Sequence, residues 1–201
     1  MIHIDKDKYS ISENNRHKTQ IAKTQIVLGC SLRKDSNHIT RLQHKEYGKT
    51  KKWNTYTISR NGNIYEHFDP KYHSDFMNNK EINMKIISII IENMGCLFKT
   101  PDDKYINWLH EVCDEENVVE RQLSNYCFWE RITDEQLIST AELCKILCDK
   151  FSIPKKLIEF NHYHKDINKF RGIVFRSNYI EDSSDINPLF DIMRFNKILD
   201  N

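Results

Sequence analysis

Two stretches of the chain are apolar at most successive positions, and both are short. They are Thr24–Cys30 (TQIVLGC) and Lys85–Glu92 (KIISIIIE). Runs of this length that are rich in isoleucine and valine predict buried β-strands. Since the second run is apolar on both faces that a strand presents, we expect a central strand with helices packed on both sides of its sheet.

The segment between these two strands predicts a β-hairpin. Two β-prone runs, Trp53–Ser59 and Asn63–Phe68, flank the dipeptide Asn61-Gly62. Asn-Gly between two such runs is the strongest short-range hairpin signal, because both residues tolerate the positive φ angles of a tight turn.

Helical periodicity is clearest after Thr133. Thr133 with Gln136 three residues later is the pattern of a capping box, in which each side chain accepts a hydrogen bond from the backbone of the other. Apolar residues then recur at helical spacing, at Leu137, Ala141, Leu143, Cys144, Leu147 and Cys148. Further helices are expected over about residues 37–47 and from Pro188 onward.

The remaining segments complete the expected domain. Residues 1–22 are polar and aperiodic and predict an N-terminal arm. Residues 96–130 are rich in aromatic and acidic side chains, and we expect a long excursion with one short helix near residues 105–112. Short strands are expected at Leu157–Phe160 and Gly172–Arg176. Residues 23–201 are thus expected to form a single α/β domain, with a mixed central β-sheet flanked by about three helices.

Charge and composition argue against several function classes. The chain has 30 Lys and Arg against 29 Asp and Glu, a net charge of +1, whereas dedicated nucleic-acid binders carry a basic excess. The run 86–91 is too short to span a bilayer, and the N-terminus lacks the apolar segment of a secretory signal peptide. We therefore expect no membrane partner and a location in the cytoplasm of the producing cell. The six cysteines form no Cys-x-x-Cys pair, and Cys144 and Cys148 are interpreted as core residues.

Seven short motifs follow one another along the chain: IVLGCS at Ile26–Ser31, QHKEYG at Gln43–Gly48, NTYTISRNGNIY at Asn54–Tyr65, the pair Tyr72-His73, ISIIIENMG at Ile87–Gly95, the helical segment Thr133–Pro154, and DINPLFD at Asp185–Asp191. In this order they resemble the N-acetylmuramoyl-L-alanine amidases, a family that includes peptidoglycan recognition proteins and T7-type phage lysozymes. The resemblance implies peptidoglycan or a muropeptide as partner and zinc as cofactor. The family holds Zn²⁺ with two His and a Cys or Asp, and the metal activates a water that attacks an amide bond.

The resemblance places the first zinc ligand, a histidine, at the end of the first strand, where this chain has Gly29. Glycine has no side chain that could bind a metal. The neighbouring Cys30 should point to the opposite face of the sheet, because side chains alternate along a strand. It would replace the histidine only through a bulge or a register shift, so we expect a degenerate zinc site.

Two alignments remain open for the second ligand. Counted forward from Ile153-Pro154, the family histidine falls at His162. Counted back from Asp185, it falls at Arg176, which does not bind metals. We favour His162, because the spacing between the helix and the following strand is short and hard to alter. The third ligand matches Asp185, while a lysine frequent two residues before it is replaced by Ser183.

Four other residues are expected to contribute to the site. Glu92 matches the acidic residue on the family's central strand and is the expected catalytic acid or base. Asn54 stands where the family has a tyrosine, Tyr56 follows at an aromatic position, and His73 matches a histidine beside the cleft. These three are expected to bind the substrate, and all four should converge with the metal ligands along one concave surface.

Three functions fit these observations. The first is a peptidoglycan-binding module whose zinc hydrolysis is weak or absent. The second is an active zinc amidase, a lysin, in which His38, His44 or His164 supplies the missing ligand. The third is a structural protein of a phage particle that contacts other virion proteins through the aromatic excursion, since exposed Trp and Tyr often anchor interfaces. A phage-encoded product also fits the Ile-, Lys- and Asn-rich composition.

Overall fold

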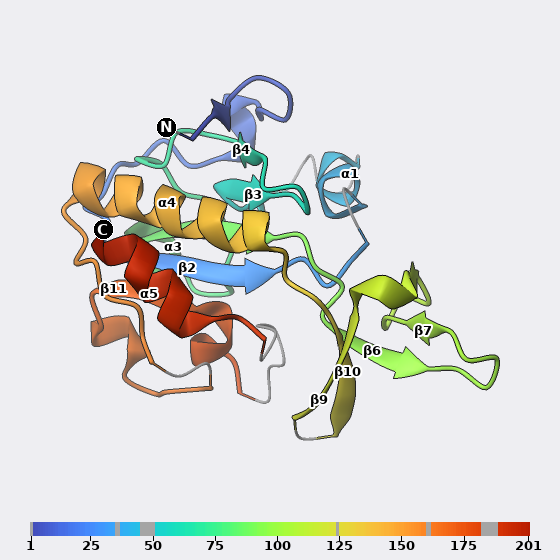
Figure 1. Cartoon of the computed structure of the whole chain (residues 1–201). Coiled ribbons are helices and arrows are strands. Elements are labelled where there is room, and N and C mark those ends of the chain that lie inside the picture. Colours follow the sequence, from blue (N-terminus) through green and yellow to red (C-terminus); the bar gives the residue numbers. More distant parts are fainter. Residues whose placement is uncertain (1, 35–36, 45–50, 124, 160–161, 182–188) are drawn as a thin grey trace.

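The chain folds around a six-stranded mixed sheet with the strand order β1-β4-β3-β5-β2-β11 (Figure 1). The computed structural model describes residues 2–34, 37–44, 51–123, 125–159, 162–181 and 189–201. The six strands are β1 (Ile4–Asp5), β2 (Gln25–Cys30), β3 (Tyr56–Ile58), β4 (Ile64–Glu66), β5 (Ile86–Ile91) and β11 (Gly172–Phe175). β5 pairs in parallel with β2 and β3, and β11 pairs in parallel with β2, whereas β3 and β4 are antiparallel. The expected α/β fold with a mixed sheet is confirmed.

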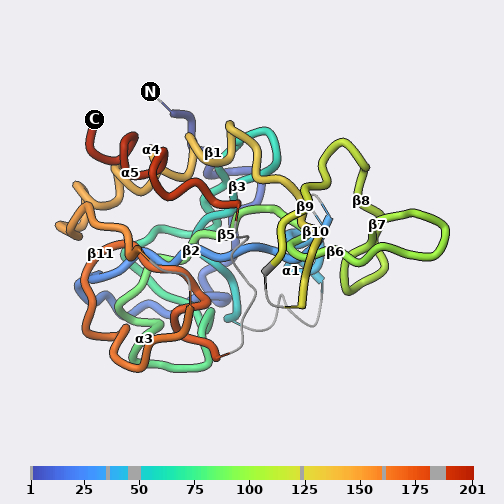
Figure 2. Tube along the Cα trace, turned by 60° about the horizontal axis from the view of Figure 1, so that its bottom comes forward, coloured from blue at the N-terminus to red at the C-terminus, as the bar shows by residue number. Residues whose placement is uncertain are grey.

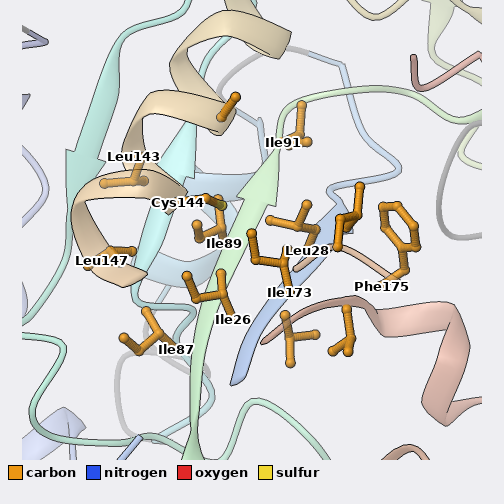
Figure 3. Close-up of a cluster of buried hydrophobic side chains, with 14 of the residues drawn as sticks. Ile26, Leu28, Ile87, Ile89, Ile91, Leu143, Cys144, Leu147, Ile173 and Phe175 are labelled. Carbon is orange, nitrogen blue, oxygen red and sulfur yellow. The ribbon is translucent and has the colours of Figure 1, made fainter. Parts of the chain in front are cut away.

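One face of the sheet buries the main hydrophobic core. Alternate side chains of β2 and β5, together with residues of β11, pack against helix α4 (Asp134–Phe151) (Figure 3). The labelled core residues are Ile26, Leu28, Ile87, Ile89, Ile91, Leu143, Cys144, Leu147, Ile173 and Phe175. Figure 2 shows α4 and α5 (Ile192–Asp200) on one side of the sheet and α3 (Lys80–Lys85) on the other. Burying each Ile or Leu side chain stabilises the fold by about 1.5–3 kcal/mol.

Local signals start and end α4. The Thr133 hydroxyl accepts the backbone N–H of Gln136 at 3.1 Å, and the Gln136 side-chain oxygen accepts the backbone N–H of Thr133 at 3.2 Å. This reciprocal pair confirms the predicted capping box. The helix ends at Ser152, which adopts the left-handed conformation with φ 53°. Such a residue ends a helix by turning the chain away from its axis.

The predicted hairpin is also confirmed. Asn61 and Gly62 connect β3 to β4, Gly62 has φ +78°, and its N–H donates to the carbonyl of Ser59 at 2.9 Å. A Cβ atom at Gly62 would lie 2.9 Å from the backbone oxygen of Glu135. Two features of this position therefore require glycine: the positive φ of its backbone and the close approach of α4.

Residues 96–130 form a second, smaller sheet with the order β8-β7-β6-β10-β9. Its strands are antiparallel: β6 (Cys96–Lys99), β7 (Tyr105–Ile106), β8 (Val112–Cys113), β9 (Val118–Leu123) and β10 (Tyr126–Glu130), with the short 3₁₀ helix η2 (Glu115–Asn117) between β8 and β9. The short helix expected near residues 105–112 is wrong. The Asn107 side-chain oxygen accepts the N–H of Leu109 and of Glu111, each at 3.0 Å, and His110 has φ 61°. Asparagine that bonds its own backbone in this way favours a turn over a helix.

The N-terminal arm lies against the main sheet. Ile4 and Asp5 of β1 pair in parallel with Ile64 and Tyr65 of β4. After the 3₁₀ helix η1 (Glu13–Asn15), a single antiparallel bridge joins the arm at residue 17 to residue 73. Backbone hydrogen bonds hold the arm at several points, so a polar segment without apolar periodicity can lie against the sheet.

The remaining elements agree with the sequence in part. Helix α1 (Asn37–Gln43) begins where expected, and the 3₁₀ helices η3 (Ile167–Lys169) and η4 (Arg176–Tyr179) flank β11. The strand expected at Leu157–Phe160 is replaced by one parallel bridge between Leu157 and Ile173, and Phe160 lies outside the described residues. α5 begins at Ile192, and the carboxylate of Asp191 caps it.

Two further expectations concern composition. Cys144 and Cys148 are both buried in the main core, in agreement with their interpretation as core residues. Within the described ranges, none of the helices is both long enough and apolar enough to cross a membrane.

Candidate functional site

The face of the sheet opposite the main core carries many polar side chains. Strand register sets which residues share this face, because residues paired across neighbouring strands point the same way. Gly29 pairs with Ile90, Ile90 pairs with Thr57, and Thr57 pairs with Tyr65. Polar residues on or beside this face are Gln25, Ser88, Thr55, Thr57 and His67. We call this surface the polar face, and it is where the resemblance places the site.

Arg176 lies beside Gly29 on the polar face. Phe175, the last residue of β11, pairs with Leu28 of β2. Arg176 then begins η4 directly after Phe175, and Gly29 follows Leu28. The Arg176 guanidinium donates through Nη2 to the carbonyl of Cys30 at 3.1 Å. The Cys30 side chain is fully buried in the main core on the other face. The strand register thus favours the alignment in which Arg176, and not His162, takes the position of the second family histidine.

The other proposed ligands do not join Gly29 in the described part of the chain. His162 is exposed on the segment before β11, where its carbonyl accepts a hydrogen bond from the side-chain amide of Asn178 at 2.9 Å. His164 is exposed, and its ring nitrogen Nδ1 accepts the N–H of Asp166 at 3.2 Å. Asp185 lies outside the described residues, as does Ser183.

His38 and Asn54 meet at the edge of the polar face. His38 is in the first turn of α1, and its Nε2 lies 2.9 Å from the side-chain oxygen of Asn54. Burial first, and then the nearby His67, Arg176 and Arg33, lower the pKa of His38 to about 4, although its bond to Asn54 acts in the opposite direction. The proximity of Arg176 places His38 close to the end of β2, where Gly29 lies.

The hydrogen bonds continue from Asn54 into the protein. The Asn54 amide nitrogen donates to the carbonyl of Tyr56 at 2.6 Å and to the hydroxyl of Thr57 at 2.8 Å. The Thr57 hydroxyl lies 2.8 Å from Nε2 of His67, whose Nδ1 lies 2.9 Å from the carbonyl of Tyr9 in the arm. Burial lowers the pKa of His67 to about 4. We call the side chains of His38, Asn54, Thr57 and His67 the polar chain.

Glu92 is on the same face, close to the end of β5. It follows Ile90 by two residues, and its N–H donates to the carbonyl of Ile58 at 2.8 Å, which continues the strand pairing. Its carbonyl accepts a hydrogen bond from Gln136 of α4 at 2.6 Å, and the residue is 3% exposed. α4 therefore holds the backbone of Glu92 in place.

The structure does not bring the side chains of Tyr56 or His73 close to the strand ends that carry Gly29 and Glu92. Tyr56 is packed in the main core, and its hydroxyl donates to Glu66 at 2.8 Å. His73 stacks on His17 of the arm with ring centroids 4.7 Å apart. Burial first, and then His17 and Lys23, lower the pKa of His73. Lys23 precedes β2, whereas Gly29 is near its end, about 20 Å further along an extended chain.

Among the residues that the structure describes, the polar face presents no set of donors that fits a zinc ion. A structural or catalytic zinc site needs at least three protein ligands. Within the described ranges, no three His, Cys, Asp or Glu side chains are grouped so that they could hold a metal ion. The two strand ends that should supply histidines carry Gly29 and the cationic Arg176.

Sequence reasoning missed His67 and Thr57. His67 follows β4, and its N–H donates to the carbonyl of Thr55 at 2.9 Å, so it is opposite the strand that carries Thr57. The alternation Thr55, Thr57 on one side of the hairpin was a signal for a polar face. The partner strand's register was needed to add His67.

Comparison with known proteins agrees with this fold. A family model described as N-acetylmuramoyl-L-alanine amidase matches residues 17–172. Among solved structures, the N-acetylmuramoyl-L-alanine amidase LysC from Clostridium intestinale is 12% identical with a TM-score of 0.57, over 100% of this chain and 99% of that one. The catalytic domain of XlyA is 13% identical with a TM-score of 0.56, over 98% and 99%. The hydrolase AmiA of Staphylococcus aureus, in complex with its ligand, is 11% identical with a TM-score of 0.53, over 98% and 80%. No curated protein sequence matches the chain.

Proposed function

Since the chain belongs to the N-acetylmuramoyl-L-alanine amidase family, we propose that it binds peptidoglycan fragments on the polar face and does not hydrolyse them with zinc. Membership of the family supports peptidoglycan as the substrate class. The further step, from hydrolysis to binding, depends on the residues that stand at the ends of β2 and β11.

The observation that carries this step is the position of Arg176 beside the end of β2 that carries Gly29. These neighbours occupy the two strand ends at which the resemblance expects histidine ligands. A rigid sheet holds ligands at such positions, so a loop residue does not easily replace them at the Zn–N distance of about 2 Å. One family position, that of Asp185, keeps a residue that binds metals, and one ligand is too few for a zinc site.

The charge of Arg176 also argues against a zinc ion on the polar face. The Arg176 guanidinium bonds the carbonyl of Cys30, which follows Gly29, and it is close enough to His38 to lower the pKa of that histidine. A fixed positive charge beside the position of a metal repels a divalent cation. The same charge favours ligands that carry carboxylate groups, which the stem peptides of peptidoglycan contain.

The test measures metal content, binding and turnover on the same protein preparation. The protein is purified without a nickel or zinc column, and its zinc is measured per chain after incubation with Zn²⁺. Binding of a soluble disaccharide-tetrapeptide muropeptide is measured by calorimetry, and release of the peptide by chromatography. We expect binding, no stoichiometric zinc and no release of peptide.

Two variants sharpen the test. The double variant Gly29→His with Arg176→His restores both histidines and should raise zinc uptake, whereas its matched control, Gly29→Ala with Arg176→Ala, should not. The Glu92→Ala variant tests the expected acid or base in any protein that shows turnover. Robust peptide release by the unmodified protein, abolished by a chelator and by Glu92→Ala, would overturn the proposal and establish an active amidase. If the protein neither binds the muropeptide nor releases its peptide, the result would favour a structural role in a particle.

A further inference from the structure

The four side chains of the polar chain are joined by hydrogen bonds whose directions can be worked out. The order begins at the carbonyl of Tyr9, which can only accept. Nδ1 of His67 lies 2.9 Å from this oxygen and therefore carries a hydrogen. Because burial lowers the pKa of His67 to about 4, the ring is neutral at pH 7, and its other nitrogen, Nε2, has a lone pair.

The next two bonds have one direction each. Nε2 of His67 accepts from the Thr57 hydroxyl at 2.8 Å, so the oxygen of Thr57 is left to accept from Asn54. The Asn54 nitrogen also donates to the carbonyl of Tyr56 at 2.6 Å. A flipped amide would place two oxygens against each other there, so the orientation of Asn54 is fixed.

The last bond fixes the tautomer of His38. The oxygen of Asn54 faces Nε2 of His38 at 2.9 Å and can only accept, so Nε2 carries the hydrogen. The neutral ring of His38 therefore has its lone pair on Nδ1. His38 and His67 are thus neutral histidines in opposite tautomers, connected through one threonine and one asparagine.

Exposure distinguishes the two ends of the polar chain. His67, Thr57 and Asn54 are at most 1% exposed, whereas His38 keeps part of its surface accessible. The polar chain therefore runs from the buried interior to a histidine that a ligand can reach. The charged and titratable groups near this end are His67, Arg176 and Arg33, which place it at the strand ends of the polar face.

We propose that the polar chain presents Nδ1 of His38 as a fixed hydrogen-bond acceptor for an N–H or O–H group of the bound muropeptide. This inference rests on the proposed function, because it concerns the same surface. His38 contacts the ligand, and Asn54, Thr57 and His67 are positioning residues that act through it. Amide N–H and sugar hydroxyl groups are the donors that a peptidoglycan fragment offers.

The orientation is tested first in the ligand-free protein. Nitrogen-15 NMR at pH 7 should show His38 protonated on Nε2 and His67 protonated on Nδ1. In the Asn54→Asp variant, a carboxylate beside His38 should raise the pKa of that ring and protonate Nδ1, which turns the acceptor into a donor. The reverse tautomer for His38 in the unmodified protein would overturn the inference.

The contact is tested with two substitutions of the same residue. His38→Gln keeps a donor that can reach Asn54 but removes the acceptor at the δ position, whereas His38→Asn keeps an acceptor at that position. We expect His38→Gln to weaken muropeptide binding by about three- to tenfold, the effect of one hydrogen bond, and His38→Asn to weaken it less. Asn54→Asp should weaken binding most at low pH, where His38 is protonated.

The outcomes separate this inference from the proposed function. If the unmodified protein and His38→Gln bind the muropeptide equally well, the contact is wrong and the proposed function stands. If the unmodified protein does not bind the muropeptide, both are overturned. Weaker binding by His38→Gln together with the expected tautomers supports both.

Discussion

Lowering the pH should destabilise the fold through His67. This ring is 1% exposed, and burial lowers its pKa from 6.5 to about 4 in the folded chain. Between pH 6.5 and pH 4 the unfolded chain therefore binds a proton that the folded chain does not, and acidification favours unfolding. Protonation in the folded state would add a hydrogen at Nε2, where His67 now accepts from Thr57.

The size of the effect follows from the pKa values. Each pH unit within this window lowers the free energy of unfolding by about 1.4 kcal/mol for one such group. Acidification from pH 6.5 to pH 4 would then lower the free energy of unfolding by about 3 kcal/mol through His67 alone. This is a large share of the roughly 5–15 kcal/mol that stabilises a typical protein. His38, whose pKa is also lowered to about 4, should add to the loss.

Urea unfolding at pH 7, 6, 5 and 4 measures this dependence. His67→Gln should be less stable than the unmodified protein at pH 7, because hydrogen bonds to Thr57 and Tyr9 are weakened, but it should lose less stability on acidification. The exposed His3 offers a matched control, since His3→Gln should follow the unmodified protein at every pH. Equal pH dependence in His67→Gln and the unmodified protein would refute the assignment of His67 as a neutral buried donor.

Three further predictions concern local structure. Gly62→Ala should lower the free energy of unfolding by about 1–3 kcal/mol, because an alanine would keep a strained positive φ and approach Glu135; a change near zero in urea unfolding would contradict the turn. Thr133→Ala should cost about 1 kcal/mol through loss of the helix cap, whereas Thr133→Ser should cost little. In a thiol-alkylation time course read by mass spectrometry, Cys127 should react before Cys144, since burial raises the pKa of Cys144 and encloses its sulfur.

Elements with local signals could be predicted from the sequence, and elements that depend on distant pairing could not. The apolar runs gave β2 and β5, Asn61-Gly62 gave the hairpin, and Thr133 gave the start of α4. The second sheet was missed because its strands pair across loops of different length and their alternation is obscured by charged residues. No periodicity within a segment specifies such pairing.

The candidate site shows the same division. Strand alternation alone predicts that the side chain of Cys30 points away from the face on which Gly29 lies. The choice between His162 and Arg176 required the register of β11 against β2, which the spacing from flanking motifs left open. The bond from His38 to Asn54 depends on how α1 docks against β3, and no sequence pattern encodes that distance.

The position of Tyr9 has a consequence for how the limits of the domain are drawn. The region that matches the family begins at residue 17, so the carbonyl that receives the hydrogen of His67 lies upstream of it. A protein trimmed to the family region would keep β2, β5 and the hairpin, yet its His67 would no longer be obliged to carry a hydrogen on Nδ1. Either tautomer of His67 could then form, and the bond between His67 and Thr57 could reverse, whereas the carbonyl of Tyr56 would still fix the orientation of Asn54 and hence the bond to His38. The segment that shows no apolar pattern is thus the part of the chain that sets which ring nitrogen of the buried His67 carries the hydrogen.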